Sequence, residues 1–120
     1  MTTPSNDQSI TLTVSLVNNS PTYQYSPAGP VQVYASESII YNLNDQTGLG
    51  LFFADIGFLN PFNNIIDQVI ISPDGKTATL IDLDNVPGTT DFQFIFNYTK
   101  NDNKLLLISP DPQVINHDTK

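Results

Sequence analysis

Apolar and polar residues alternate along much of the chain. Between residues 9 and 16 every second residue is aliphatic and the others are Ser or Thr. Residues 31–35 repeat the alternation, and residues 92–98 carry Phe or Tyr at every second position. A period of two is typical of a strand that buries one face. The pattern therefore predicts a protein built mainly from β-strands.

Turn-forming residues separate these segments. Ser72–Lys76 reads Ser-Pro-Asp-Gly-Lys, in which Pro presets φ and Gly supplies a positive φ, so it predicts a tight turn. That turn would join residues 67–72 to residues 77–82 in a hairpin. A second hairpin is predicted between residues 92–98 and 104–108.

Other breaks in the pattern mark a loop, a corner and a single helical turn. Residues 21–30 contain three Pro and one Gly and predict an extended loop. Ser36–Glu37 interrupts two strand-like runs, as a bulge or a corner between sheets would. Asn60–Pro61 is a helix-start signal, and we expect one helical turn over 61–64 before a strand ending at Ile71.

The apolar run at residues 49–54 predicts a central strand that is covered on both faces. Val114–Ile115 predicts a short terminal strand. About eight or nine strands at regular spacing favour an all-β, antiparallel two-sheet β-sandwich with immunoglobulin-like or related Greek-key topology. A closed barrel is the alternative. We expect one domain over residues 1–120, with residues 1–8 and 117–120 flexible.

Composition removes most enzymatic chemistry. The chain of 120 residues has no Cys, no Trp and no Arg, and its single His is His117 near the end. Most mechanisms use His, Cys or Arg to move protons, attack substrates or hold anions. We therefore expect a protein that is not an enzyme and needs no cofactor, with His117 solvated in the tail.

The net charge of −8 excludes two partner classes. Four Lys cannot build the basic patch that nucleic acids require, and the charge repels anionic lipid surfaces. The N-terminus lacks the features of a secretory signal, and no apolar run approaches the ~18 residues of a membrane helix. These features predict a soluble, cytoplasmic protein.

Asp and Asn cluster at Asp82, Asp84 and Asn85. Such oxygen ligands suit Ca²⁺, although the segment lacks the EF-hand arrangement. The alternative is a turn in which these side chains bind nearby backbone N–H groups. A further alternative is a small hydrolase that uses a pair of the abundant Asp carboxylates.

Aromatic residues supply the other candidate site. Tyr23 and Tyr25 lie in the Pro-rich stretch, and Tyr34 follows it closely. Exposed tyrosines stack on sugars or anchor protein partners, whereas the Phe residues are expected in the core. We interpret the three tyrosines as a binding surface.

The C-terminal third carries a recognisable pattern. It comprises residues 82–85, the aromatic strand 94–98 and residues 108–116, in which Asp111–Pro112 precedes Val-Ile-Asn. This pattern resembles the DP-EP family of small, uncharacterised bacterial proteins, and more distantly the inclusion-body proteins of the AidA/PixA type. The resemblance implies a small β-sandwich of unknown function and supplies no catalytic residues.

Asp111–Pro112 also has a physical interpretation. Pro removes an N–H from the ladder and favours an extended conformation for Asp111. We expect a structural latch in which the Asp111 carboxylate accepts backbone N–H groups of a neighbouring loop. Together, these features predict a non-enzymatic sandwich that acts by protein or carbohydrate binding or by self-association.

Overall fold

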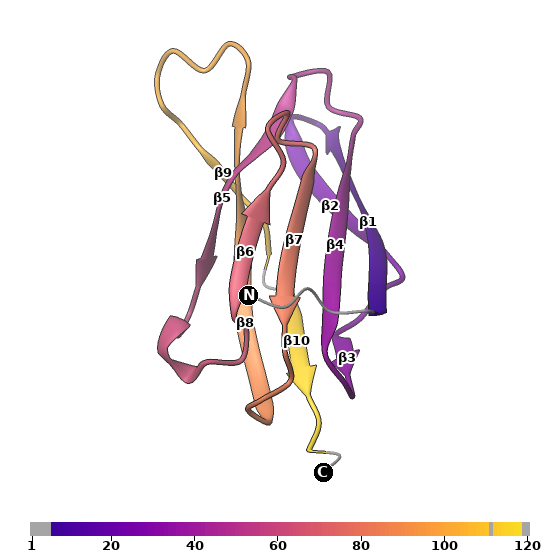
Figure 1. Ribbon diagram of the computed structural model, residues 1–120. Coiled ribbons are helices and arrows are strands. Elements are labelled where there is room, and N and C mark those ends of the chain that lie inside the picture. The colour runs from indigo at the N-terminus through magenta and orange to yellow at the C-terminus, as the bar shows by residue number, and fades with distance from the viewer. Residues whose placement is uncertain (1–5, 111, 119–120) are drawn as a thin grey trace.

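Ten strands and one short helical turn make up the part of the chain that the computed structural model describes, residues 6–110 and 112–118. They form two layers (Figure 1), so the predicted all-β two-sheet sandwich is confirmed and the closed barrel is excluded. In chain order the elements are β1 (Asn6–Val17), β2 (Ser20–Ser26), β3 (Val31–Val33), β4 (Glu37–Asp45), β5 (Leu51–Phe58), η1 (Pro61–Asn63), β6 (Gln68–Ile71), β7 (Thr77–Asp82), β8 (Gly88–Tyr98), β9 (Leu107–Ile108) and β10 (Gln113–Asn116).

Both sheets are mixed. The first has the strand order β2-β1-β4-β7-β6 and the second has the order β3-β10-β8-β5, with β9 beside β8. Most neighbours are antiparallel, but β1 is parallel to β4 and β3 is parallel to β10. The expectation of wholly antiparallel sheets is wrong at these two pairs. After β2 the chain crosses to the second sheet as β3 and returns as β4 on the other side of β1.

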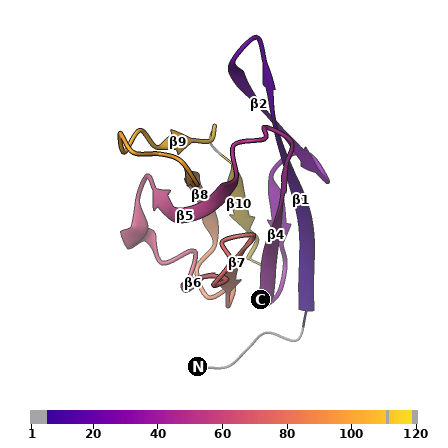
Figure 2. The same ribbon diagram turned by 90° about the horizontal axis from the view of Figure 1, so that it is seen from above.

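The core lies between the two sheets (Figure 2). Phe92, Phe94 and Phe96 on β8 are buried, as their alternation predicts. The ring of Phe94 meets that of Tyr41 on β4 edge-on, with centroids 4.8 Å apart. Burying one such side chain contributes about 1.5–3 kcal/mol, and aromatic pairs add about 0.5–1.5 kcal/mol. The aromatic stripe of β8 therefore holds the two sheets together.

The interruption at Ser36–Glu37 is a corner, because β3 belongs to the second sheet and β4 to the first. The predicted helical turn is also confirmed. The Asn60 side chain accepts a hydrogen bond of 3.0 Å from the Phe62 N–H, and η1 occupies Pro61–Asn63. The chain then turns into β6.

The predicted hairpin between β6 and β7 is confirmed. The Gly75 N–H donates to the Ser72 carbonyl at 2.9 Å, and Gly75 has a positive φ of 70°. The turn docks onto β5, since the Phe53 N–H donates to the Gly75 carbonyl at 2.7 Å. A Cβ on Gly75 would lie only 2.6 Å from the Cβ of Phe52.

The prediction that residues 49–54 form a central strand is wrong. β5 is the edge strand of the second sheet, and Ala54 and Asp55 are exposed. The apolar residues suggested a strand with neighbours on both sides. Phe52 is instead covered by the turn between β6 and β7.

β8 has two partners along one side. β9 pairs with its Ile95 and Phe96, which confirms the second hairpin, and β10 pairs with residues 88–91. The register shifts by one residue between these two pairings. β10 also confirms the predicted terminal strand.

The two termini are more ordered than expected in their described parts. β1 begins at Asn6, and residues 6–8 pair with residues 37–39 of β4. The backbone N–H of His117 donates to the Val33 carbonyl at 2.9 Å. Residues 6–8 and His117 are thus held by the sheets, because backbone pairing with β4 and β3 outweighs their polar composition.

Candidate binding site

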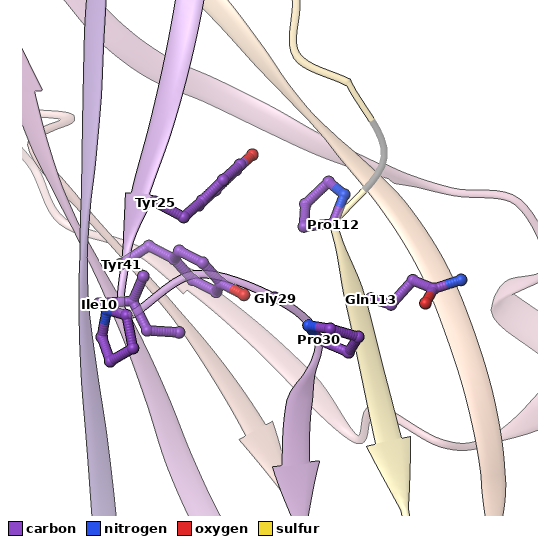
Figure 3. Close-up of a pocket in the computed structure, with 8 residues that line it drawn as sticks. Ile10, Tyr25, Gly29, Pro30, Tyr41, Pro112 and Gln113 are labelled. Carbon is purple, nitrogen blue, oxygen red and sulfur yellow. The ribbon is translucent and has the colours of Figure 1, made fainter.

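A pocket of about 260 Å³ opens between the two sheets, at the sandwich edge that β2 and β3 form (Figure 3). One wall belongs to the first sheet and consists of Ile10 on β1, Tyr25 on β2 and Tyr41 on β4. The volume lies just below the roughly 300–1,000 Å³ of pockets for drug-sized ligands. The pocket therefore suits one aromatic or aliphatic group of a larger partner.

Strand register places the two tyrosines side by side. Tyr25 pairs with Leu12 of β1, and Tyr41 pairs with Ile10, two residues away on the other side of the same strand. Because side chains two residues apart share a face, both rings point toward the second sheet. Their centroids are 6.2 Å apart in an edge-on arrangement.

The buried hydroxyl of Tyr25 is the unusual feature of this wall. Tyr41 is only 1% exposed and directs its hydroxyl toward the pocket. The Tyr25 hydroxyl is buried and has no hydrogen-bond partner among the described residues. Buried polar groups in folded proteins are nearly always satisfied. A buried, unsatisfied hydroxyl beside a pocket indicates that its acceptor comes from a ligand.

Burial also affects the acidity of both phenols. Desolvation raises the pKa of Tyr25 to about 12, although the nearby Ser109 hydroxyl acts in the opposite direction. The Ser109 hydroxyl accepts from the Phe94 N–H at 2.8 Å and donates to the Pro110 carbonyl at 3.1 Å, which leaves one of its two lone pairs unoccupied. Burial raises the pKa of Tyr41 as well. Both side chains therefore remain neutral hydrogen-bond donors at physiological pH.

The opposite wall and the rim are rich in Pro. The loop between β2 and β3 contributes Pro27, Gly29 and Pro30, and the start of β10 contributes Pro112 and Gln113. None of these described lining residues is charged, so the pocket favours an uncharged group. The rings of Pro are rigid, which limits the entropy lost when a ligand binds.

Gln113 is held in place from outside the pocket. Its side-chain amide donates to the Asp91 carboxylate at 2.6 Å.

The three tyrosines predicted as a binding surface lie in different places and do not form one surface. Tyr25 lines the pocket, and Tyr23, on the same face of β2, donates through its hydroxyl to the Ile108 carbonyl at 3.3 Å. Tyr34 lies beyond β3 and stacks on the His117 ring, with centroids 4.3 Å apart. Only Tyr25 therefore belongs to the pocket.

The acidic segment at the end of β7 is largely internal. Asp82 and Asp84 are buried, whereas Asn85 is exposed. One Asp82 oxygen accepts from the Asp84 N–H at 2.9 Å, as in the turn that the sequence offered as an alternative. The other Asp82 oxygen, Oδ2, is buried without a hydrogen-bond partner among the described residues.

Asn116 on β10 packs into the same region. Its amide nitrogen donates to the Val86 carbonyl at 2.9 Å, while its Oδ1 is buried and receives no hydrogen bond from any described residue. Burial, together with the nearby carboxylates of Asp84 and Asp67, raises the pKa of Asp82 to about 6. The Asp84 N–H and the Asn116 side chain oppose this shift.

Metal binding by these residues stays a prediction. Within residues 6–110 and 112–118, no three His, Cys, Asp or Glu side chains are grouped closely enough to hold an ion. A site at Asp82 would therefore need amide or backbone oxygens. The hydrolase that would use an Asp pair likewise stays a prediction.

Of the two residues of the predicted latch, Asp111 lies outside the described residues and only Pro112 is described. Pro112 lines the pocket, and its carbonyl accepts a hydrogen bond of 3.2 Å from the Phe92 N–H. Pro112 thus links β8 to the pocket wall.

Sequence reasoning missed Tyr41, Ile10 and Gln113 as pocket residues. Tyr41 is a polar-tipped residue at an inward position of the run 38–43, and that conflict was the available signal. Gln113 carried no signal of its own, because its position depends on the pairing between β10 and β8.

The comparisons with known proteins agree with the predicted family. The model of the DP-EP family matches residues 8–118, which is most of the chain. No curated protein matches it. The more distant likeness to AidA/PixA-type proteins stays a prediction. The described part of the chain contains no helix with the length and apolar character needed to cross a membrane.

Proposed function

Because the chain belongs to the DP-EP family, an uncharacterised family, its function has to be argued from its own site, and we propose a non-enzymatic binding module. The pocket between β2, β4 and β10 takes an uncharged, partly apolar group of a partner. The single observation that supports this proposal is the buried, unpartnered hydroxyl of Tyr25 beside an uncharged pocket.

The chemistry of the pocket defines what it selects. The rings and prolines contribute apolar contact, and the phenols donate hydrogen bonds to carbonyl, amide or hydroxyl oxygens of the ligand. A charged ligand would lose its hydration without meeting an opposite charge among the described lining residues. Side chains in a protein partner and rings of a neutral sugar both meet these requirements.

A direct test uses N-acetyl-phenylalaninamide as an uncharged probe. At a probe concentration about tenfold above Kd, binding adds about 1.4 kcal/mol to the free energy of unfolding, so the melting temperature rises by a few degrees. Pro30→Trp places a larger ring at the pocket rim and should abolish the rise. Pro21→Trp, on the exposed part of β2, is the matched control and should keep it.

Two results would contradict the proposal. One is that neither this probe nor a neutral oligosaccharide, maltohexaose, stabilises the wild-type protein. The other is that Pro30→Trp and Pro21→Trp respond equally.

Cation binding is a second candidate that one observation favours. Asp82 Oδ2 and Asn116 Oδ1 are both buried acceptors that no described donor satisfies. A Ca²⁺ ion would satisfy such oxygens. Calorimetry with CaCl₂ should then show heat that Asp82→Asn removes, and the absence of both heat and thermal stabilisation would exclude this candidate.

A further inference from the structure

The turn between β5 and β6 presents the two most exposed large apolar side chains of the described residues. Leu59 is 82% exposed and Phe62 is 86% exposed. The backbone that carries them is well held, since the Leu59 N–H donates to the Asp91 carbonyl at 3.0 Å and Asn60 caps Phe62. An ordered turn that exposes two large apolar side chains is a candidate contact site.

This turn and the pocket lie at opposite edges of the sandwich. β2 and β3 are the first strands of their sheets, and the loop between them borders the pocket. β5 and β6 are the last strands of the second and first sheets, and η1 connects them. Figures 1 and 2 both show η1 and β2 on opposite sides of the molecule. One copy can therefore present its turn to the pocket of another without blocking its own pocket.

The two surfaces are also chemically complementary. The turn from Leu59 to Asn64 carries no charge, and neither do the described residues that line the pocket. A pocket of about 260 Å³ has room for one aromatic ring. The exposed Asn64 offers an amide oxygen as an acceptor for the hydroxyls of Tyr25 and Tyr41.

We propose that Phe62 of one copy inserts into the Tyr25–Tyr41 pocket of a second copy. The inference rests on the proposed binding function of the pocket and names its occupant. Such a contact is heterologous, because the two copies use different surfaces, so it propagates into a chain or closes into a ring. Phe buries only about 150–250 Å². This area lies well below the roughly 1,200–2,000 Å² of stable complexes, so the contact is weak and needs high protein concentrations.

Two complementary variants test this contact by analytical ultracentrifugation at millimolar protein. Phe62→Asp removes the inserted ring and Pro30→Trp obstructs the pocket, so each variant alone should sediment as a monomer. An equimolar mixture should form a heterodimer and nothing larger, because it keeps one intact turn and one open pocket. Leu105→Asp, an exposed apolar residue in another loop, makes the same kind of change and should associate like the wild type.

Thermal unfolding of each variant checks that the fold is intact. The inference is overturned by a wild-type protein that stays monomeric, or by a mixture that forms no heterodimer. It is also overturned if Leu105→Asp abolishes association as Phe62→Asp does. If N-acetyl-phenylalaninamide still stabilises the protein through the pocket in those cases, the proposed binding function stands and only the identity of the occupant fails.

Discussion

Tyr25 combines an inward position with a polar group that the fold does not satisfy. Its ring meets that of Tyr41 edge-on, with centroids 6.2 Å apart, and its hydroxyl is buried beside the pocket without a hydrogen-bond partner among the described residues. Leaving a buried polar group unsatisfied costs about 1–3 kcal/mol. Keeping this group at the pocket wall therefore lowers stability in favour of ligand binding.

Tyr25→Phe should therefore stabilise the fold and weaken binding. We expect the free energy of unfolding to rise by about 1 kcal/mol, because the substitution removes only the unsatisfied hydroxyl. Tyr23→Phe is the matched control and should lower stability, since the Tyr23 hydroxyl donates to Ile108. Urea denaturation measures both. A loss of stability in Tyr25→Phe equal to that in Tyr23→Phe would show that the Tyr25 hydroxyl has a partner.

Asp82 should make stability decrease as the pH rises. Its pKa is raised by burial to about 6 in the folded state, against about 3.9 in the unfolded chain. Below pH ~4 both states hold the proton, so Asp82 imposes no penalty. Between pH ~4 and ~6 only the unfolded state releases it, so about 2 kcal/mol of stability is lost as the pH rises.

Comparing the wild type with Asp82→Asn isolates this effect, because the amide cannot ionise. The difference in unfolding free energy between the two should grow across that pH interval. A constant difference would mean that Asp82 titrates normally in the folded protein.

The turn between β6 and β7 depends on Gly75 for two reasons, its backbone conformation and its close packing against β5. Gly75 needs a positive φ of 70° to close the hairpin, and its missing Cβ allows Phe52 of β5 to approach. Gly48 has a similar φ of 77° but has no atom within 4 Å of the Cβ position. Substitutions at the two positions therefore distinguish the cost of backbone strain, which both share, from the cost of a steric clash, which only Gly75 has.

Gly75→Ala should destabilise the protein more than Gly48→Ala. Both substitutions incur the left-handed strain of about 1–2 kcal/mol, and Gly75→Ala adds about 1–3 kcal/mol for the clash with Phe52. Thermal denaturation of the two variants provides the comparison. Equal losses would contradict the docking of this turn on β5.

At the level of elements, the sequence predicted local structure better than pairing. The alternation in residues 9–16 and 92–98, the Pro-Asp-Gly turn and the Asn60–Pro61 helical turn are all confirmed, because each depends on neighbouring residues. The parallel pairs and the edge position of β5 were missed, because they depend on how distant strands meet. The same limit hid Tyr41 and Gln113. Tyr25 carried its own signal as an aromatic in the Pro-rich stretch 21–30, although residues up to Ser26 form β2 and not the expected loop.

For the molecule as a whole, the net charge of −8 acts against contact between copies. The Debye length falls from about 30 Å at 0.01 M salt to about 8 Å at 0.15 M, so added salt screens this repulsion. If copies associate through Phe62, NaCl should strengthen the association, which sedimentation at both salt concentrations measures. Association that weakens with salt would indicate contacts between opposite charges instead of an uncharged turn in an uncharged pocket.

The central claim is that the pocket beside Tyr25 and Tyr41 binds an uncharged group. The most direct measurement is a titration of ¹⁵N-labelled protein with N-acetyl-phenylalaninamide, followed by the amide signals in two-dimensional NMR spectra. The account predicts saturable shifts at Ile10, Gly29, Tyr41 and Gln113, which Pro30→Trp removes. Shifts confined to residues outside the pocket, or none up to the solubility limit of the probe, would contradict it.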